Sequence, residues 1–173
     1  MRGGAHTLAP MLHCGTDGGM TSDPLPAFDP QRFLRHGVGG HGGLLALTYH
    51  AHGPDWVELH LPYRAELIGD PGSGVLASGP ILTMMDMATS LAVWTRLGRF
   101  RPHATLDLRI DYLRPATPGK AVFGRGECYR ITRSISFVRG QAHDGDPADP
   151  LAHVAGTFMF TDAPVEAPVE LGA

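Results

Sequence analysis

Residues 79–94 read GPILTMMDMATSLAVW, an apolar run that predicts a buried helix. Pro80 suits the first helical position, and Gly98 suits the position just after the last turn. One acid interrupts the run, because Asp86 is the only Asp, Glu, Lys or Arg among residues 71–95. A buried carboxylate without partners costs several kcal/mol, roughly, so its presence here asks for a physical reason.

The composition describes an ordinary globular chain. Its 173 residues are 43% hydrophobic with a net charge of −3, which predicts one domain and gives no basic footprint for nucleic acid. Cys14 and Cys128 are far apart and belong to no CxxC pair, which argues against a disulfide framework or a zinc knuckle and favours a cytoplasmic setting. We expect no signal peptide, because residues 1–10 (MRGGAHTLAP) contain no apolar core, and no membrane span, because no apolar run approaches about 18 residues.

Strand patterns surround the helix. Residues 56–62 (WVELHLP) alternate with period two, and residues 44–50 predict a strand before them. Four further strands are predicted after the helix, over residues 104–115, 120–131, 134–142 and 151–161. Two strands, one apolar helix and four strands together predict an α+β fold, in which a curved antiparallel sheet wraps around one long central helix.

The rest of the chain is expected to be irregular. Residues 1–36 are predicted to form an N-terminal arm containing a short helix capped by Asp29, followed by a domain over residues 37–161 and a tail over residues 162–173. Within the domain, residues 37–43 predict a flexible turn and residues 63–79 a loop.

Two explanations fit Asp86. It lies on the helix face that carries Thr83 and Ser90, so it is either a solvent-facing or hydrogen-bonded structural residue, or a general base at the edge of an apolar pocket. The start of the helix offers backbone N–H groups that can hold an oxyanion. Seven residues separate Gly79 from Asp86, about 10 Å along a helix axis, so one carbonyl cannot reach both. A second, antiparallel copy of the helix would bring them together, which favours a two-fold dimer with shared sites.

Two adjacent segments carry a family resemblance. GVLASGPILTMMDMA, from residue 74, and TLDLRIDYLRPATPGK, from residue 105, resemble the hotdog-fold acyl-CoA thioesterases of the PaaI type, in the 4-hydroxybenzoyl-CoA thioesterase superfamily. The resemblance extends over about residues 37–161. It implies a hotdog fold, hydrolysis of an apolar acyl- or aryl-CoA, a homodimer or dimer of dimers, and no cofactor, since coenzyme A is part of the substrate.

The resemblance also implies roles for individual residues. Asp86 matches the catalytic acid, which activates water or attacks directly, and the amides of Ser78 and Gly79 match the pair that polarises the thioester carbonyl. Thr105 matches a hydroxyl that places the water or the base. The implied substrate contacts are Arg133 and Ser134 near the coenzyme A phosphates, Met85 in the acyl pocket, and Asp70 upstream of the helix.

One departure leaves a second function open. The family histidine is replaced by Ala77, and the HGG at residues 41–43 is not a substitute motif, because no acid follows it at the required spacing. The alternative is therefore a non-catalytic acyl-CoA-binding or regulatory hotdog domain. A hydratase-type relative is less favoured, because no histidine adjoins a suitable aspartate.

Overall fold

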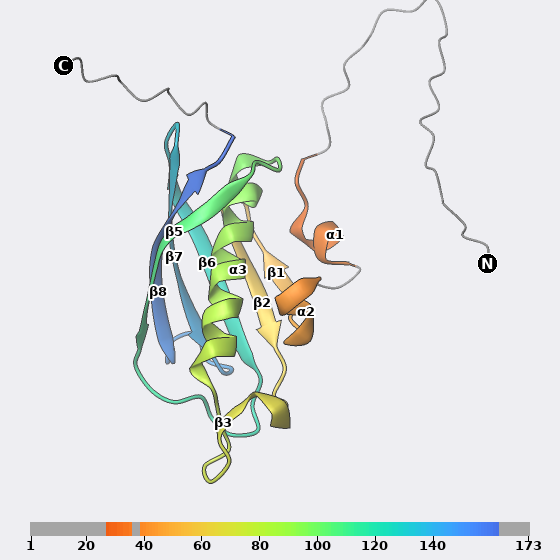
Figure 1. The fold of residues 1–173 in the computed structure, drawn as a ribbon, viewed down its shortest axis with the longest axis vertical. Helices are drawn as coiled ribbons and strands as arrows, with labels where there is room; N and C mark the ends of the chain where they lie inside the picture. Colours follow the sequence, from red (N-terminus) through yellow and green to blue (C-terminus); the bar gives the residue numbers. More distant parts are fainter. Residues whose placement is uncertain (1–26, 36–38, 163–173) are drawn as a thin grey trace, which may run out of the picture.

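The computed structural model describes residues 27–35 and 39–162, so most of the predicted N-terminal arm and C-terminal tail lies outside the described residues. Its main helix, α3 (Ser78–Leu97), lies against one face of a six-stranded sheet (Figure 1). The strands of this sheet are β1 (Thr48–His52), β2 (Trp56–Leu61), β5 (His103–Tyr112), β6 (Val122–Ile131), β7 (Ile135–His143) and β8 (Ala152–Phe160).

The sheet has the order β1-β2-β6-β7-β8-β5, and every neighbouring pair is antiparallel. It curves around α3, so the predicted hotdog arrangement of a sheet wrapped around one long helix is confirmed (Figure 1). Strand β5 forms one edge, and α1 (Pro30–Leu34) and α2 (Gly40–Leu44) lie beside α3. None of the helices that the structure describes has the length and apolar character needed to cross a bilayer.

Three local predictions differ from the structure. Helix α3 begins at Ser78 rather than Pro80, because the first turn needs no internal N–H bonds and tolerates a proline within it. Helix α2 covers part of the predicted flexible turn (residues 37–43) and the first residue of the predicted strand (residues 44–50). It is followed directly by Leu45 and Leu47, which are buried in the core. The predicted loop over residues 63–79 contains a 3-10 helix and a small hairpin, namely η1 (Ala65–Leu67), β3 (Ile68–Asp70) and β4 (Val75–Leu76).

The helix approaches the sheet so closely that a glycine is needed between them. At Gly126 of β6, an added Cβ would lie 2.5 Å from the backbone nitrogen of Thr89 and 2.6 Å from the carbonyl carbon of Ala88. Both atoms belong to the backbone of α3, so neither can swing aside as a side chain would. The small residue therefore sets the distance between helix and sheet.

We expect Gly126→Ala to lower the free energy of unfolding by about 3 kcal/mol, because the added methyl group forces α3 away from β6. Gly79→Ala is the matched control: nothing lies within 4 Å of its added Cβ, and alanine is the better helix former. Urea unfolding followed by circular dichroism measures both variants. Equal stability of the two would contradict the close approach seen in the structure.

A partly buried ion pair lies at the end of the sheet near β7. The carboxylate of Asp144 accepts hydrogen bonds from both terminal nitrogens of Arg114, at 3.0 and 2.8 Å, and from the Thr117 amide at 2.8 Å. The Asp144 side chain is 5% exposed, whereas Asp149, which also contacts Arg114, is 70% exposed. Asp144 therefore joins the chain after β5 to the chain after β7.

Candidate active site

Asp86 lines a cleft of about 530 Å³ between α3 and the α1–α2 segment. The helix contributes one wall and the N-terminal segment the other, and much of the lining is apolar. The lining residues are Phe33, Leu34, Gly39, His41, Gly42, Thr83, Asp86, Met87, Ser90, Leu91 and Trp94. Asp86 is half-buried, so its carboxylate is neither sealed in the core nor fully solvated.

Strand β5 holds one oxygen of this carboxylate. The Thr105 hydroxyl donates a hydrogen bond to Asp86 Oδ1 at 2.9 Å. Thr105 pairs with Phe158 of β8 and Asp107 pairs with Thr157, which leaves Leu106 as the extra residue of a β-bulge. The bulge turns Thr105 toward α3, on the same face as Leu108. The regular two-residue alternation of a strand is therefore broken at Leu106, which is 53% exposed.

A second contact joins α3 and β5 one helical turn further along. Ser90 Oγ lies 2.8 Å from His103 Nε2, and His103 Nδ1 lies 3.1 Å from the carbonyl oxygen of Arg101. Burial lowers the pKa of His103, although the hydrogen bond to Arg101 and the nearby charge of Asp86 act in the opposite direction. These contacts fix the imidazole beside Ser90, whose side chain lines the cleft.

The start of α3 presents two unbonded amides. The Ala77 N–H donates to the Leu67 carbonyl at 2.8 Å, and Pro80 has no N–H. Ile81 can bond within the helix to the carbonyl four residues earlier. In the part of the chain that the structure describes, Ser78 and Gly79 are therefore the amides of the first turn without an acceptor, and both are exposed. Neither lines the cleft that holds Asp86.

Two other predicted residues lie away from this cleft. Asp70 is exposed in the β3–β4 turn, where it accepts hydrogen bonds from the Gly72 and Ser73 amides, at 3.1 and 3.2 Å. Hydrogen bonding, first of all to Ser73, lowers the pKa of Asp70. Met85 is fully buried and points at the sheet, since its sulfur would contact a Cβ added at Gly124. The methionine that lines the cleft is Met87.

Arg133 and Ser134 lie in the exposed turn between β6 and β7. The Arg133 carbonyl accepts a hydrogen bond from Arg101 at 3.2 Å, and the Ser134 carbonyl accepts one from Phe160 at 2.9 Å. The turn thus adjoins the segment between α3 and β5, beyond the end of the cleft marked by Trp94. The structure brings Asp86 and Thr105 together and leaves the other predicted residues apart from them in a single chain.

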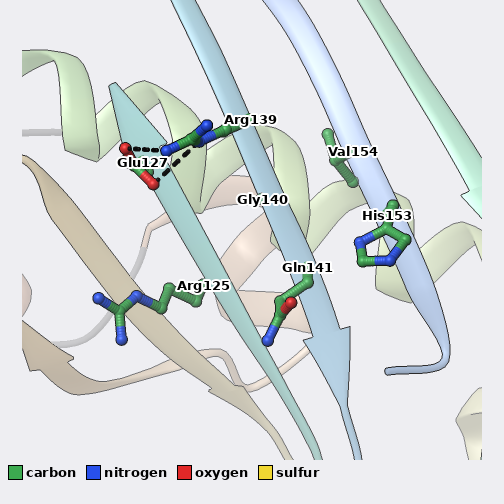
Figure 2. A pocket seen from close by; sticks show the side chains of 7 residues that line it. All are labelled: Arg125, Glu127, Arg139, Gly140, Gln141, His153 and Val154. Atoms are coloured by element: carbon green, nitrogen blue, oxygen red, sulfur yellow. Dashed lines mark hydrogen bonds and ion pairs between the residues drawn. The ribbon is translucent and has the colours of Figure 1, made fainter. Parts of the chain in front are cut away.

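A separate hollow of about 380 Å³ lies on the outer face of the sheet, away from α3. Figure 2 shows Arg139 of β7 directed at Glu127 of β6, with nitrogen–oxygen distances of 3.1 and 2.9 Å, and Arg125 further along β6. The hollow contains none of the predicted site residues. Its charged groups are largely paired on an open surface, and the apolar cleft at Asp86 is the stronger candidate for a catalytic site.

Sequence reasoning did not predict as site residues the polar cleft-lining residues His41, Thr83 and Ser90, or His103, which contacts Ser90. His41 belongs to the HGG segment that the sequence analysis set aside, yet it lines the cleft through α2. Ser90 follows Asp86 by four residues, a spacing that places both on one helix face and could have identified it. His103 has no such local signal, because its contact with Ser90 depends on where β5 packs.

Comparisons with known proteins agree on one family. Residues 73–150 match the family model described as the thioesterase superfamily. A crystal structure of a Pseudomonas aeruginosa protein is 44% identical, covers 75% of this chain and 94% of its own, and has a TM-score of 0.66. A search of curated proteins gives no match.

More distant structures share the fold. A thioesterase from Haemophilus influenzae is 20% identical, with a TM-score of 0.64 over 75% of this chain and 85% of its own. A mutant of the phenylacetic acid degradation protein PaaI from Thermus thermophilus is 24% identical, with a TM-score of 0.59 over 68% of this chain and 96% of its own.

Proposed function

The chain belongs to the thioesterase superfamily, and on that premise we propose that it hydrolyses the thioester of an apolar acyl- or aryl-CoA, with Asp86 as general base or nucleophile. One observation carries this proposal: the Asp86 carboxylate is fixed by Thr105 on the wall of a largely apolar cleft. The cleft suits the acyl group, and the carboxylate can act on a water molecule beside it. The proposed chemistry uses no cofactor.

The reaction follows from the free oxygen of Asp86. With Oδ1 accepting from Thr105, Oδ2 is available to take a proton from water as the water oxygen bonds to the thioester carbon. The resulting oxyanion collapses, the carbon–sulfur bond breaks, and coenzyme A leaves as a thiolate that is then protonated. In the nucleophilic variant, Asp86 attacks the thioester carbon, the carbon–sulfur bond breaks with release of the coenzyme A thiolate, and water then hydrolyses the resulting anhydride to the free acid and the Asp86 carboxylate.

The oxyanion requires hydrogen-bond donors aimed at the thioester oxygen. The free amides of Ser78 and Gly79 can supply them, but they lie about two turns along α3 from Asp86. We propose a two-fold dimer in which each chain supplies these amides to the partner's Asp86. Strand β5 offers an open sheet edge for such pairing, and the exposed Leu82 lies on the same helix stripe as Asp86.

The dimer makes a direct prediction. Sedimentation equilibrium at micromolar concentration should give at least twice the chain mass of 18.5 kDa. Turnover should fall on dilution below the dimer dissociation constant, because each site then loses its oxyanion donors. A monomeric chain with full turnover would contradict the shared site.

The end of the cleft toward the β6–β7 turn is the proposed exit for the pantetheine arm. Arg133 is exposed there, and a guanidinium suits phosphate because of its forked donors. Ser134 adjoins it. Asp70, in its exposed turn near the start of α3, is a proposed contact for the partner's substrate rather than for the cleft of its own chain.

A panel of CoA esters tests the function. Thiol release from acetyl-, octanoyl-, phenylacetyl- and benzoyl-CoA is followed with a chromogenic disulfide. We expect the octanoyl or aryl esters to exceed acetyl-CoA by more than about tenfold in kcat/KM, since burying two methylenes contributes about 1.6 kcal/mol. Binding of every ester without thiol release would contradict the proposed hydrolase activity. It would favour the alternative of a non-catalytic acyl-CoA-binding domain, which the replacement of the family histidine by Ala77 leaves open.

A further inference from the structure

Two side-chain hydrogen bonds connect α3 to β5 side by side. Thr105 contacts Asp86 at 2.9 Å, and His103 contacts Ser90 at 2.8 Å. Four residues along a helix rise about 6 Å, and two residues along a strand rise about 6.6 Å, so the two contacts match in spacing. The Ser90 hydroxyl therefore lies one helical turn from the Asp86 carboxylate, on the wall of the same cleft.

The partners of His103 determine the direction of the Ser90 hydroxyl. A carbonyl oxygen only accepts, so His103 Nδ1, at 3.1 Å from the Arg101 carbonyl, carries a proton. The ring is packed against Trp94 and Phe158, with centroids 5.1 and 5.0 Å away, and this burial lowers its pKa and favours the neutral form. Nε2 of a neutral ring with a protonated Nδ1 is an acceptor. Ser90 therefore donates its proton to Nε2 and leaves its oxygen lone pairs for the cleft.

We propose that His103 is a positioning residue, which directs the Ser90 hydroxyl so that its oxygen accepts a hydrogen bond from the attacking water. The role rests on the proposed thioester hydrolysis. The water gives one proton to Asp86 as its oxygen bonds to the thioester carbon, while its other hydrogen is held by Ser90 Oγ. A hydroxyl pointing the other way would donate to the water and occupy one of its two lone pairs. Fixing the hydroxyl therefore keeps the water oriented for attack.

Kinetics of single and double variants test this role. We expect Ser90→Ala and His103→Phe each to lower kcat about tenfold, the scale of one hydrogen bond, with KM changed less than about twofold. The double variant should match Ser90→Ala, because His103 acts through Ser90. Ser90→Thr, which keeps the hydroxyl, should retain most of kcat. Thr95→Ala is the control, since that hydroxyl bonds the Leu91 carbonyl within α3.

Additive losses in the double variant would overturn the role of His103. A readout that needs no turnover is long-range ¹⁵N–¹H correlation NMR of the full chain at neutral pH. We expect His103 to show a protonated Nδ1 and an unprotonated Nε2, and a protonated Nε2 would also overturn the role, even if His103→Phe fails to fold. A wild-type chain that hydrolyses no CoA ester overturns the proposed function and the water-positioning role together. Additive kinetics or the wrong tautomer in an active enzyme overturn only the latter.

Discussion

Asp86→Asn should lower kcat for CoA-ester hydrolysis by about 10³-fold, within the range typical of a lost general base and larger than the loss expected for any other single change considered. The amide cannot take a proton from water and cannot attack as a carboxylate does. Its carbonyl oxygen can still accept the Thr105 hydroxyl, which donates at 2.9 Å to Asp86 Oδ1. The fold and the cleft should therefore persist while the chemistry stops.

The measurement is single-turnover thiol release with the best ester of the panel, together with calorimetric binding of a non-hydrolysable CoA thioether. Binding by the variant should stay within about threefold of wild type, because the cleft wall is otherwise intact. Asp107→Asn is the matched control: it removes the same charge from the exposed outer face of β5. If Asp86→Asn kept more than about a tenth of the wild-type rate, Asp86 would be neither base nor nucleophile.

Asp144→Ala should lower the free energy of unfolding by about 3–5 kcal/mol, the largest stability effect that we expect. Its carboxylate bonds both terminal nitrogens of Arg114 and the Thr117 amide, at 2.8 to 3.0 Å. Removing it leaves a partly buried guanidinium and a backbone N–H without their main acceptor. Asp149→Ala removes the other carboxylate near Arg114, but that side chain is 70% exposed, so we expect a loss of at most about 1 kcal/mol.

Acid titration checks the same contact. Hydrogen bonds from Arg114 hold the pKa of Asp144 well below its ordinary value. A carboxyl group whose pKa is lower in the folded state stabilises the fold above its unfolded pKa, about 3.9, and this contribution is lost as the pH falls below that value. The free energy of unfolding, measured with urea, should decrease less between pH 7 and pH 3 in Asp144→Ala than in wild type. Equal losses would show that this ion pair does not govern acid stability.

The central helix and the strands that flank it were predictable from local patterns. An apolar run with one acid, ended by a glycine, predicted a long buried helix, and Gly98 indeed has a φ of +65° at its end. Period-two alternation predicted a strand over residues 56–62, and in β2 (Trp56–Leu61) buried and half-buried residues indeed alternate. Such patterns show which face of a helix or strand is apolar and therefore meets the core. They can be identified in the sequence even when the element that packs against that face is not known.

The arrangement around Asp86 depended on tertiary packing. The bulge at Leu106, which turns Thr105 toward the helix, leaves no mark in a strand whose residues otherwise alternate. The contact of Ser90 with His103 joins residues 13 apart, and the glycine-rich α2 is a helix that its residues do not favour by themselves. Local sequence determined the elements and the acid because periodicity and end signals act within a few residues. Only the packed structure decided which side chains surround that acid, because register, bulges and close approaches are settled between elements distant in the chain.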